Sequence, residues 1–154
     1  MAIRNIVKEG DERLAKVCRP VEKFDRHLEE LVHDMKDTLK LAEGLGLAAP
    51  QVGILRRVVV VVDDNGKMFE LINPEIVEAV GEQEAHEGCL SIPGVFGVTH
   101  RPARVTVRAK NVKGEDVQYT REGITAVCFC HELDHLDGIL FRTHVEHYLD
   151  PDED

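Results

Sequence analysis

Residues 130–141 read CHELDHLDGILF, and within them His131, Glu132 and His135 form the pattern H-E-x-x-H. On an α-helix, residues four positions apart lie on the same face, so both imidazoles can bind one metal ion. Metal centres of the catalytic type use three protein ligands and leave one position for water or substrate. The sequence therefore predicts a helix that carries two ligands, and the fold must supply a third from elsewhere in the chain.

The size and charge of the chain limit what can surround this helix. With 154 residues, 43% of them hydrophobic, we expect a single domain over residues 1–154 with its own core. The net charge of −10 argues against direct, specific nucleic-acid binding and against an anionic membrane surface. The apolar run Val58–Val62 is far too short to span a bilayer. The N-terminal residues have no targeting pattern and the four cysteines have no disulfide-framework spacing, so a cytoplasmic protein is expected.

Two segments have the spacing of helices. Residues 25–41 place apolar side chains at helical intervals between charged ones, which predicts an N-terminal amphipathic helix capped by Asp25. A second helix is expected from about Gly123 to Asp137, with Gly138 placed to end it. The H-E-x-x-H pattern falls inside this second helix.

The residues between the two helices have the patterns of strands. The β-branched run at 58–62 predicts a buried strand, and residues 68–83 predict two strands interrupted at Pro74. Residues 103–122 alternate between apolar and polar around Lys113–Gly114, as an antiparallel hairpin does. This order predicts an α+β fold, with mostly antiparallel strands around a central metal-bearing helix.

The third ligand decides which kind of enzyme this is. In thermolysin-like proteases a glutamate on a downstream helix completes the site, but only Glu146 is available before the acidic tail. Metzincins extend the motif to a third histidine, and here Phe141, which cannot bind a metal, stands at that position. The segment HEGCLSIPG, residues 86–94, has the composition of a tight turn, and a Cys89 thiolate there can complete a Cys-His-His site. Three histidines remain as alternative ligands: His86, His144 and His147.

Three separated motifs make the chain resemble the peptide deformylase family. GLGLAAPQ at residues 44–51, EGCLS at 87–91 and HELDH at 131–135 match the three motifs of that family in the same order. The resemblance implies an enzyme that removes the formyl group from the N-terminal formylmethionine of new polypeptides and releases formate. The chain departs from the family at Cys130, where glutamine is common, and we expect this cysteine to be a neighbour of the site rather than a ligand.

The chemistry of such a centre gives Glu132 a separate role from the ligands. A metal ion held by Cys89, His131 and His135 leaves one position for water and lowers the pKa of that water from 15.7 towards about 7. Glu132 directly follows a ligand and is not needed for coordination. It is therefore placed to act as the general base, and then to return the proton to the departing amine.

The family pattern also assigns residues that contact the substrate. It gives stabilisation of the oxyanion to the side-chain amide of Gln51, the backbone N–H of Leu90 and the metal. The glycines of GLGLAAPQ suit a packing loop and the close approach of a peptide backbone equally well. Substrate contacts are expected from Gly44, Leu45, Gly46, Gly88, Val127 and Cys128.

The ligand types leave the metal open, because Cys-His-His suits zinc and iron alike. The resemblance implies one Fe²⁺ as the native ion, with Zn²⁺ or Ni²⁺ as substitutes. It also implies N-formylmethionyl peptides as partners and a transient association with the ribosome, although HYLDPDED at 147–154 does not supply the long C-terminal helix that the family often carries. Two rival functions are a zinc peptidase and a deformylase-like paralogue that binds N-termini or metal without turnover.

Overall fold

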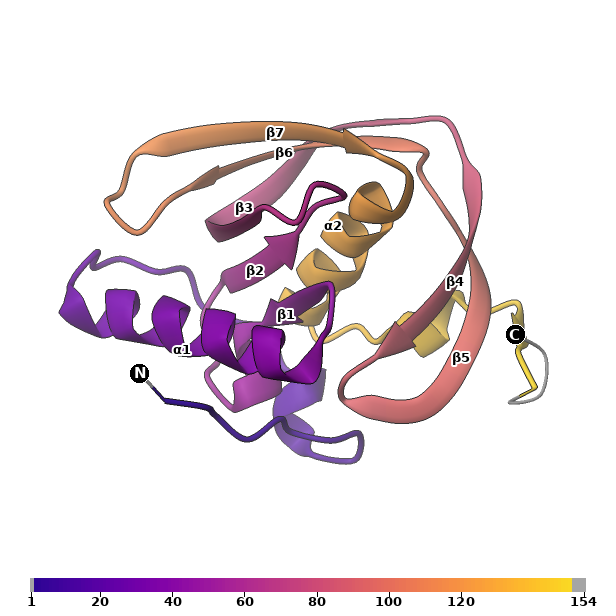
Figure 1. The fold of residues 1–154 in the computed structure, drawn as a ribbon, viewed down its shortest axis with the longest axis horizontal. Coiled ribbons are helices and arrows are strands. Elements are labelled where there is room, and N and C mark those ends of the chain that lie inside the picture. Colours follow the sequence, from indigo (N-terminus) through magenta and orange to yellow (C-terminus); the bar gives the residue numbers. More distant parts are fainter. Residues whose placement is uncertain (1, 151–154) are drawn as a thin grey trace.

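The computed structural model describes residues 2–150 and has the predicted α+β class (Figure 1). Residues 151–154, which end the HYLDPDED segment, lie outside the described range. The elements in chain order are η1 (Glu12–Ala15), α1 (Arg26–Ala42), β1 (Gly46–Ala48), η2 (Ala49–Val52), β2 (Val58–Val62), β3 (Met68–Val80), β4 (Gln83–Cys89), β5 (Ile92–Arg101), β6 (Arg104–Lys110), β7 (Asp116–Glu122), α2 (Gly123–Leu136), η3 (Phe141–His144) and β8 (His147–Tyr148). These strands form a five-stranded sheet of order β1-β2-β3-β6-β7 and a three-stranded sheet of order β4-β5-β8, with antiparallel pairing.

Strand β2 lies at the centre of the layered arrangement. Its residues Val59 and Val61 pack in one hydrophobic core with side chains of α2, while Val58 and Val60 pack in a second core with side chains of α1. Because both faces of the strand are covered, none of its positions needs a polar side chain, which explains the uninterrupted valine run. The large sheet therefore lies between α1 and α2 (Figure 1).

Both helices begin and end close to the predicted residues. The Asp25 side chain accepts a hydrogen bond from the Leu28 N–H at 3.1 Å at the start of α1. Helix α2 ends at Leu136, and Gly138 follows with a φ of +74°. A Cβ at Gly138 would lie 2.6 Å from the backbone of Ala15, so both conformation and packing require glycine there.

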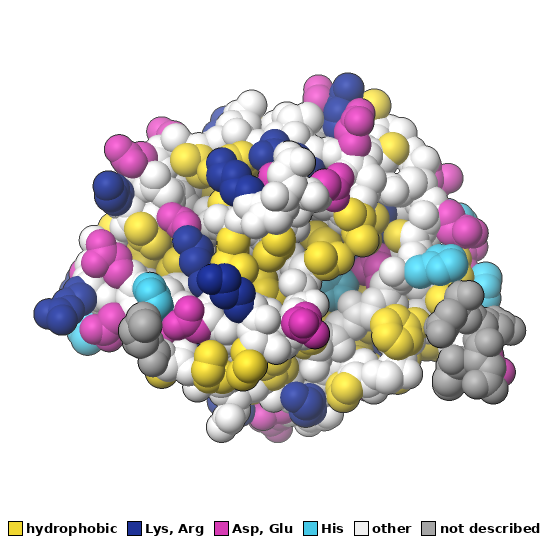
Figure 2. All heavy atoms as spheres, viewed as in Figure 1, with side chains coloured by type: hydrophobic (Ala, Val, Ile, Leu, Met, Phe, Trp, Pro, Cys, Tyr) yellow, Lys and Arg dark blue, Asp and Glu magenta, His cyan; other side chains and the backbone are white. Residues whose placement is uncertain are grey.

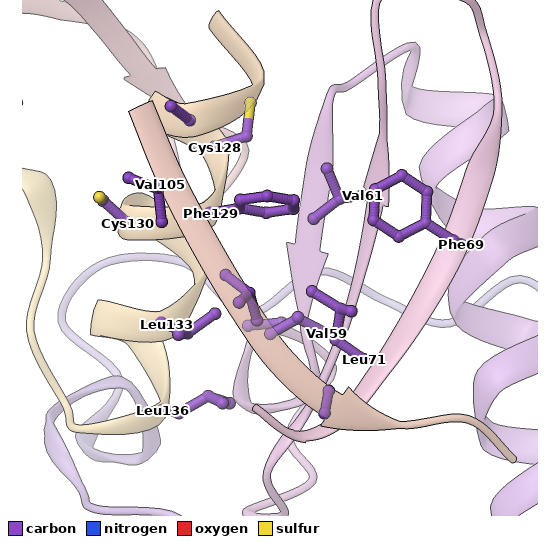
Figure 3. Packing of buried hydrophobic residues seen from close by; sticks show 14 of the residues in the cluster. Val59, Val61, Phe69, Leu71, Val105, Cys128, Phe129, Cys130, Leu133 and Leu136 are labelled. Atoms are coloured by element: carbon purple, nitrogen blue, oxygen red, sulfur yellow. The ribbon is translucent and has the colours of Figure 1, made fainter. Parts of the chain in front are cut away.

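The core between α2 and the five-stranded sheet consists of buried hydrophobic side chains. Figure 3 shows the Phe129 ring pointing from α2 toward Val61 and Phe69, and the Phe129 and Phe69 rings meet edge-on with centroids 6.1 Å apart. Eleven of the 14 residues of α2 are buried, so this helix has almost no solvent-facing side. No helix within residues 2–150 is long and apolar enough to cross a membrane.

The predicted interruption at Pro74 is wrong, because β3 runs continuously from Met68 to Val80. Only a register shift between Ile72 and Glu75 marks the proline. Asn73 adopts a φ of +52° there, and its side chain exchanges hydrogen bonds of 2.8 and 2.9 Å with the backbone of Val21. A local irregularity absorbs the missing N–H of proline, so the strand continues beyond it.

Candidate metal centre

One thiol and two imidazoles converge where β4 meets α2. Cys89 ends β4 at the hairpin into β5, while His131 and His135 lie one turn apart on α2, and one donor atom from each lies within 4.8 Å of the others. The Cys89 Sγ is 3.3 Å from His135 Nε2. Within residues 2–150 this is the one group of three or more such side chains close enough to hold an ion. A sulfur and two imidazole nitrogens suit Zn²⁺ and Fe²⁺ by their chemistry.

The three alternative histidine ligands lie outside this cluster. His86 is exposed on β4, and His147 is exposed on β8. His144 Nε2 lies 3.1 Å from Asp134 Oδ2 instead. The structure therefore brings together Cys89 and the two helical histidines, and leaves the other three histidines apart from them.

His131 is oriented by Glu87, to which the sequence analysis gave no role. Its Nδ1 is 2.9 Å from Glu87 Oε1, which leaves Nε2 for a metal. Although burial raises the pKa of Glu87, hydrogen bonds from His131, Arg101 and the Thr99 hydroxyl lower it to about 2, so this carboxylate stays ionised. Glu87 stands two positions before Cys89 on the same strand, and strand periodicity is the signal that could have found it.

The charge around the two imidazoles favours a cation. Burial lowers the pKa of His131, but Glu132, Cys89 and Glu87 together raise it to about 10. Burial and the positive charge of His131 lower the pKa of His135 to about 3, which keeps that imidazole neutral and able to bind a metal. The anionic groups that raise the pKa of His131 would also stabilise a divalent cation bound by the same imidazole.

Glu132 is buried beside these donors and lacks the partners that a buried carboxylate usually has. It is 4% exposed, and its Oε1 has no hydrogen-bond partner among the described residues. Burial raises its pKa to about 7, with His131 opposing this shift. A Cβ at Gly46 would lie 2.7 Å from Glu132 Oε2, so glycine at position 46 is what lets this side chain fit. A carboxyl group with a pKa near neutrality can both accept and return a proton.

The side chain of Gln51 is fixed by η2, the turn of 3₁₀-helix that follows β1. Its Oε1 accepts the Ala48 N–H at 2.9 Å, and its Nε2 donates to Ser91 Oγ at 3.1 Å and faces Cys89 Sγ at 3.5 Å. Because the amide oxygen is held by the backbone, the amide nitrogen is directed at the thiol. Leu90 lies in the hairpin turn directly after Cys89.

A cavity of about 430 Å³ opens onto Cys89, His131 and Glu132. Figure 2 shows hydrophobic side chains gathered in a recess on this face of the molecule, with a histidine side chain visible in it. All the residues from which substrate contacts were expected line the cavity: Gly44, Leu45, Gly46, Gly88, Val127 and Cys128. Further apolar residues of the lining were not predicted from the sequence, among them Ile92, Phe96 and Ile124.

The cavity is bordered by the outer strands of both sheets. β1 is at one end of the five-stranded sheet and β4 at one end of the three-stranded sheet, and residues of each line the cavity. A larger cavity of about 690 Å³ lies around the start of α1 and is lined by none of the residues assigned to the site.

Comparison with known proteins shows which family this chain resembles over most of its length. The sequence model described as Polypeptide deformylase matches residues 3–149. A peptide deformylase of Acetivibrio thermocellus is 54% identical over 153 residues, which cover 99% of this chain and 89% of that protein. The crystal structure of the Thermotoga maritima peptide deformylase is similar with a TM-score of 0.91 at 39% identity, covering 95% of this chain and 99% of that one. A class I type b peptide deformylase of Acinetobacter baumannii, solved with Met-Ala-Ser bound, gives a TM-score of 0.87 at 31% identity and covers 93% and 98% of the two chains.

Proposed function

This chain belongs to the peptide deformylase family, and we propose that Cys89, His131 and His135 hold the divalent metal ion that the family's reaction requires. The enzyme is a hydrolase that removes the formyl group from the N-terminal formylmethionine of nascent polypeptides and releases formate. The observation that carries the proposed site is one thiol and two imidazoles within 4.8 Å of one another beside the buried Glu132. When bound, the ion would supply a Lewis acid that lowers the pKa of a water and polarises the formyl carbonyl.

Glu132 moves the proton in this proposal. It takes a proton from the attacking water and delivers it to the amine nitrogen as the bond between the formyl carbon and that nitrogen breaks. The pKa of about 7 that burial gives Glu132 supports both transfers near neutral pH. The Gln51 Nε2 and the Leu90 N–H donate hydrogen bonds to the oxygen of the formyl group as its negative charge develops, and such donors are typically worth about 10²–10³ in rate.

The substrate lies as an extended peptide between the edges of β1 and β4. Gly46 of β1 and Gly88 of β4 both line the cavity, and the proposed peptide pairs with these two edges by strand addition. The apolar wall of the cavity, including Leu45, Val127 and Cys128, takes the flexible methionine side chain. The Met-Ala-Ser bound to the Acinetobacter baumannii relative supports this class of ligand.

The native ion in this proposal is Fe²⁺, with Zn²⁺ and Ni²⁺ as substitutes. The donor set suits each of them, so iron is carried over from the family resemblance rather than from the geometry. Because thiolate and ferrous ion both oxidise, the activity of the iron form should decay in air, while the zinc and nickel forms keep theirs longer. Equal stability of the three forms in air would contradict the assignment of iron.

The domain, the cellular compartment and the partners of the enzyme are further parts of this proposal. We propose that residues 1–154 form one domain that works in the cytoplasm and meets nascent chains through transient contact with the ribosome. Cys89 is a proposed metal ligand, and the other three cysteines, Cys18, Cys128 and Cys130, are free thiols, which supports a reducing compartment. The net charge of −10 gives no support to a direct, specific contact with nucleic acid.

Formate release by anaerobically purified, iron-loaded enzyme tests the proposed site. Formyl-Met-Ala-Ser should be turned over far faster than acetyl-Met-Ala-Ser, because donors that close around a formyl group leave no room for a methyl group. Formyl-Asp-Ala-Ser should also be slow, because burying a carboxylate in an apolar pocket is costly. Comparable turnover of the acetyl peptide would contradict the pocket. Cleavage of internal bonds in unformylated peptides would instead favour the zinc peptidase, and binding without any turnover the inactive paralogue.

A further inference from the structure

A chain of charged side chains leads from His131 toward the surface. Arg101, at the end of β5, is 5% exposed and donates to Glu87 from Nε at 2.7 Å and from Nη2 at 3.0 Å. Its Nη1 donates to Asp134 Oδ2 at 3.0 Å. His144 Nε2, from η3, lies 3.1 Å from the same oxygen. The series His131–Glu87–Arg101–Asp134–His144 therefore connects β4, β5, α2 and η3.

The stability of the fold does not by itself explain a buried arginine here. Taking two charges out of water is costly, and well-packed apolar side chains often replace a buried ion pair without loss of stability. The guanidinium instead provides geometry, since its planar fork holds both oxygens of the Glu87 carboxylate in one orientation. That orientation decides where the acceptor for His131 Nδ1 lies.

We propose that Arg101 is a positioning residue for the metal centre: through Glu87 it fixes the orientation and tautomer of His131, and Asp134 holds its guanidinium in place from α2. The proposal rests on the assignment of Cys89, His131 and His135 as metal ligands, and it concerns residues that do not touch the ion. The same contacts hold the strand that ends in Cys89 against the helix that carries both histidines.

Metal affinity and the ligand-field spectrum of the Co²⁺-loaded enzyme measure this role. Arg101→Met should weaken Co²⁺ binding, measured against a competing chelator, by about 10- to 100-fold, which is the usual effect of losing an outer partner of a metal-bound histidine. The visible absorption bands should shift in position and intensity. Arg101→Lys keeps the charge but loses the fork, so its affinity should lie between those of the parent and the methionine variant.

Arg121→Met is the matched control. Arg121 also faces a buried carboxylate, Asp63 Oδ2 at 3.5 Å, and stacks against Phe69 and Tyr119, but it contacts none of the proposed ligands. It should lower the melting temperature of the metal-free protein and leave the Co²⁺ affinity and spectrum unchanged.

Parental affinity and spectrum in Arg101→Met, or a change no larger than in Arg121→Met, would overturn the proposal and leave Arg101 as a structural ion pair. If Arg101→Met does not fold, Arg101→Lys decides in the same way, since parental affinity and spectrum there would also overturn it. Failure of the underlying ligand assignment gives a different result, because Cys89→Ala would then bind Co²⁺ as the parent does.

Discussion

Helix α1 buries one face, whereas helix α2 is buried on nearly every side. Seven of the 17 residues of α1 are buried, against 11 of 14 in α2. The charged residues of α1 mostly face water, so hydrophobic packing against the large sheet explains that helix. The buried set of α2 includes His131, Glu132 and His135, which cost free energy to remove from water. Apolar packing therefore explains the burial of α1, whereas the buried polar side chains of α2 need a second reason, which the proposed metal site supplies.

One buried carboxylate on each helix shows the same contrast. Asp34 on α1 is 7% exposed, and it accepts the Ala2 N–H at 2.9 Å and the Arg4 Nε at 3.0 Å. The hydrogen bond from Ala2 has the largest effect on the pKa of Asp34. Together with the bond from Arg4 it lowers this pKa, although burial acts to raise it. On α2, the Oε1 atom of Glu132 has no hydrogen-bond partner within residues 2–150. Burial raises the pKa of this carboxyl group to about 7. Its hydrogen bonds keep Asp34 ionised, whereas the raised pKa lets Glu132 change its protonation state near neutral pH.

Replacing one glutamate by glutamine on each helix should give the largest difference between the helices, and this difference is in activity. Glu132→Gln should lose about 10²–10⁴ in kcat/KM, because the base is removed while size is kept. It should still bind one metal ion per chain. Glu29→Gln, on the exposed side of α1, should keep parental kinetics. Deformylation assays with metal analysis measure both, and substantial turnover by Glu132→Gln would show that the base is misassigned.

Shortening a buried side chain of α1 should have the opposite effect: it should lower stability and leave activity unchanged. Met35 is fully buried in the core between α1 and the large sheet. Met35→Ala should lower the free energy of unfolding by about 2–5 kcal/mol, as large-to-small core changes do. Its KM and metal content should stay at parental values well below the melting temperature. Denaturant titration and steady-state kinetics test this, and a tenfold rise in KM would mean that α1 also shapes the site.

The two carboxylates should give pH dependences of opposite sign in metal-free protein. The pKa of Glu132 is raised from 4.5 to about 7 by burial, so its contribution to stability falls as pH rises through that window. Glu132→Gln should therefore gain stability relative to the parent from pH 4.5 to 7. The pKa of Asp34 is lowered from 3.8, so its stabilisation is present above that value and is lost in acid.

Asp34→Asn should consequently lose stability relative to the parent above pH 3.8, and the two should converge as the pH falls below it. Denaturant midpoints of the parent and both variants, measured from pH 3 to 8, give the two differences. If the two stability differences change with pH in the same direction, the contrast between the helices is contradicted.

Helix capping should give the smallest difference. The Asp25 side chain caps α1 through the Leu28 N–H, whereas Glu122 at the start of α2 makes no such side-chain bond. Asp25→Ala should cost about 1 kcal/mol of stability. Glu122→Ala should lose no capping energy. Chemical denaturation compares them, and equal losses would show that the Asp25 bond is not what stabilises the start of α1.

Patterns local in the sequence predicted much of this molecule. The apolar intervals of α1, the valine run of β2 and the alternation around Gly114 each lie within one element or one hairpin, so they can be recognised without the fold. Cys89, His131 and His135 could be proposed as ligands for a similar reason, because each stands in a short motif whose spacing or composition indicates a ligand.

What the sequence could not predict depends on contacts between elements. Arg101 and Glu87 are 14 positions apart, and only the register of β4 against β5 brings their side chains together. The path of β3 past Pro74 likewise depends on Asn73, whose side chain bonds the distant Val21. In the sequence, Phe96 cannot be distinguished from other apolar strand residues, and only the fold shows that it lines the cavity.

The central proposition is that α2 buries polar side chains because two of them, with Cys89, bind a metal. X-ray absorption spectroscopy of the zinc-loaded protein tests this most directly. We predict one zinc–sulfur distance of ~2.3 Å and two zinc–imidazole distances of ~2.0–2.1 Å, with the sulfur contribution lost in Cys89→Ala. A zinc shell without sulfur, or one that Cys89→Ala leaves unchanged, would contradict it.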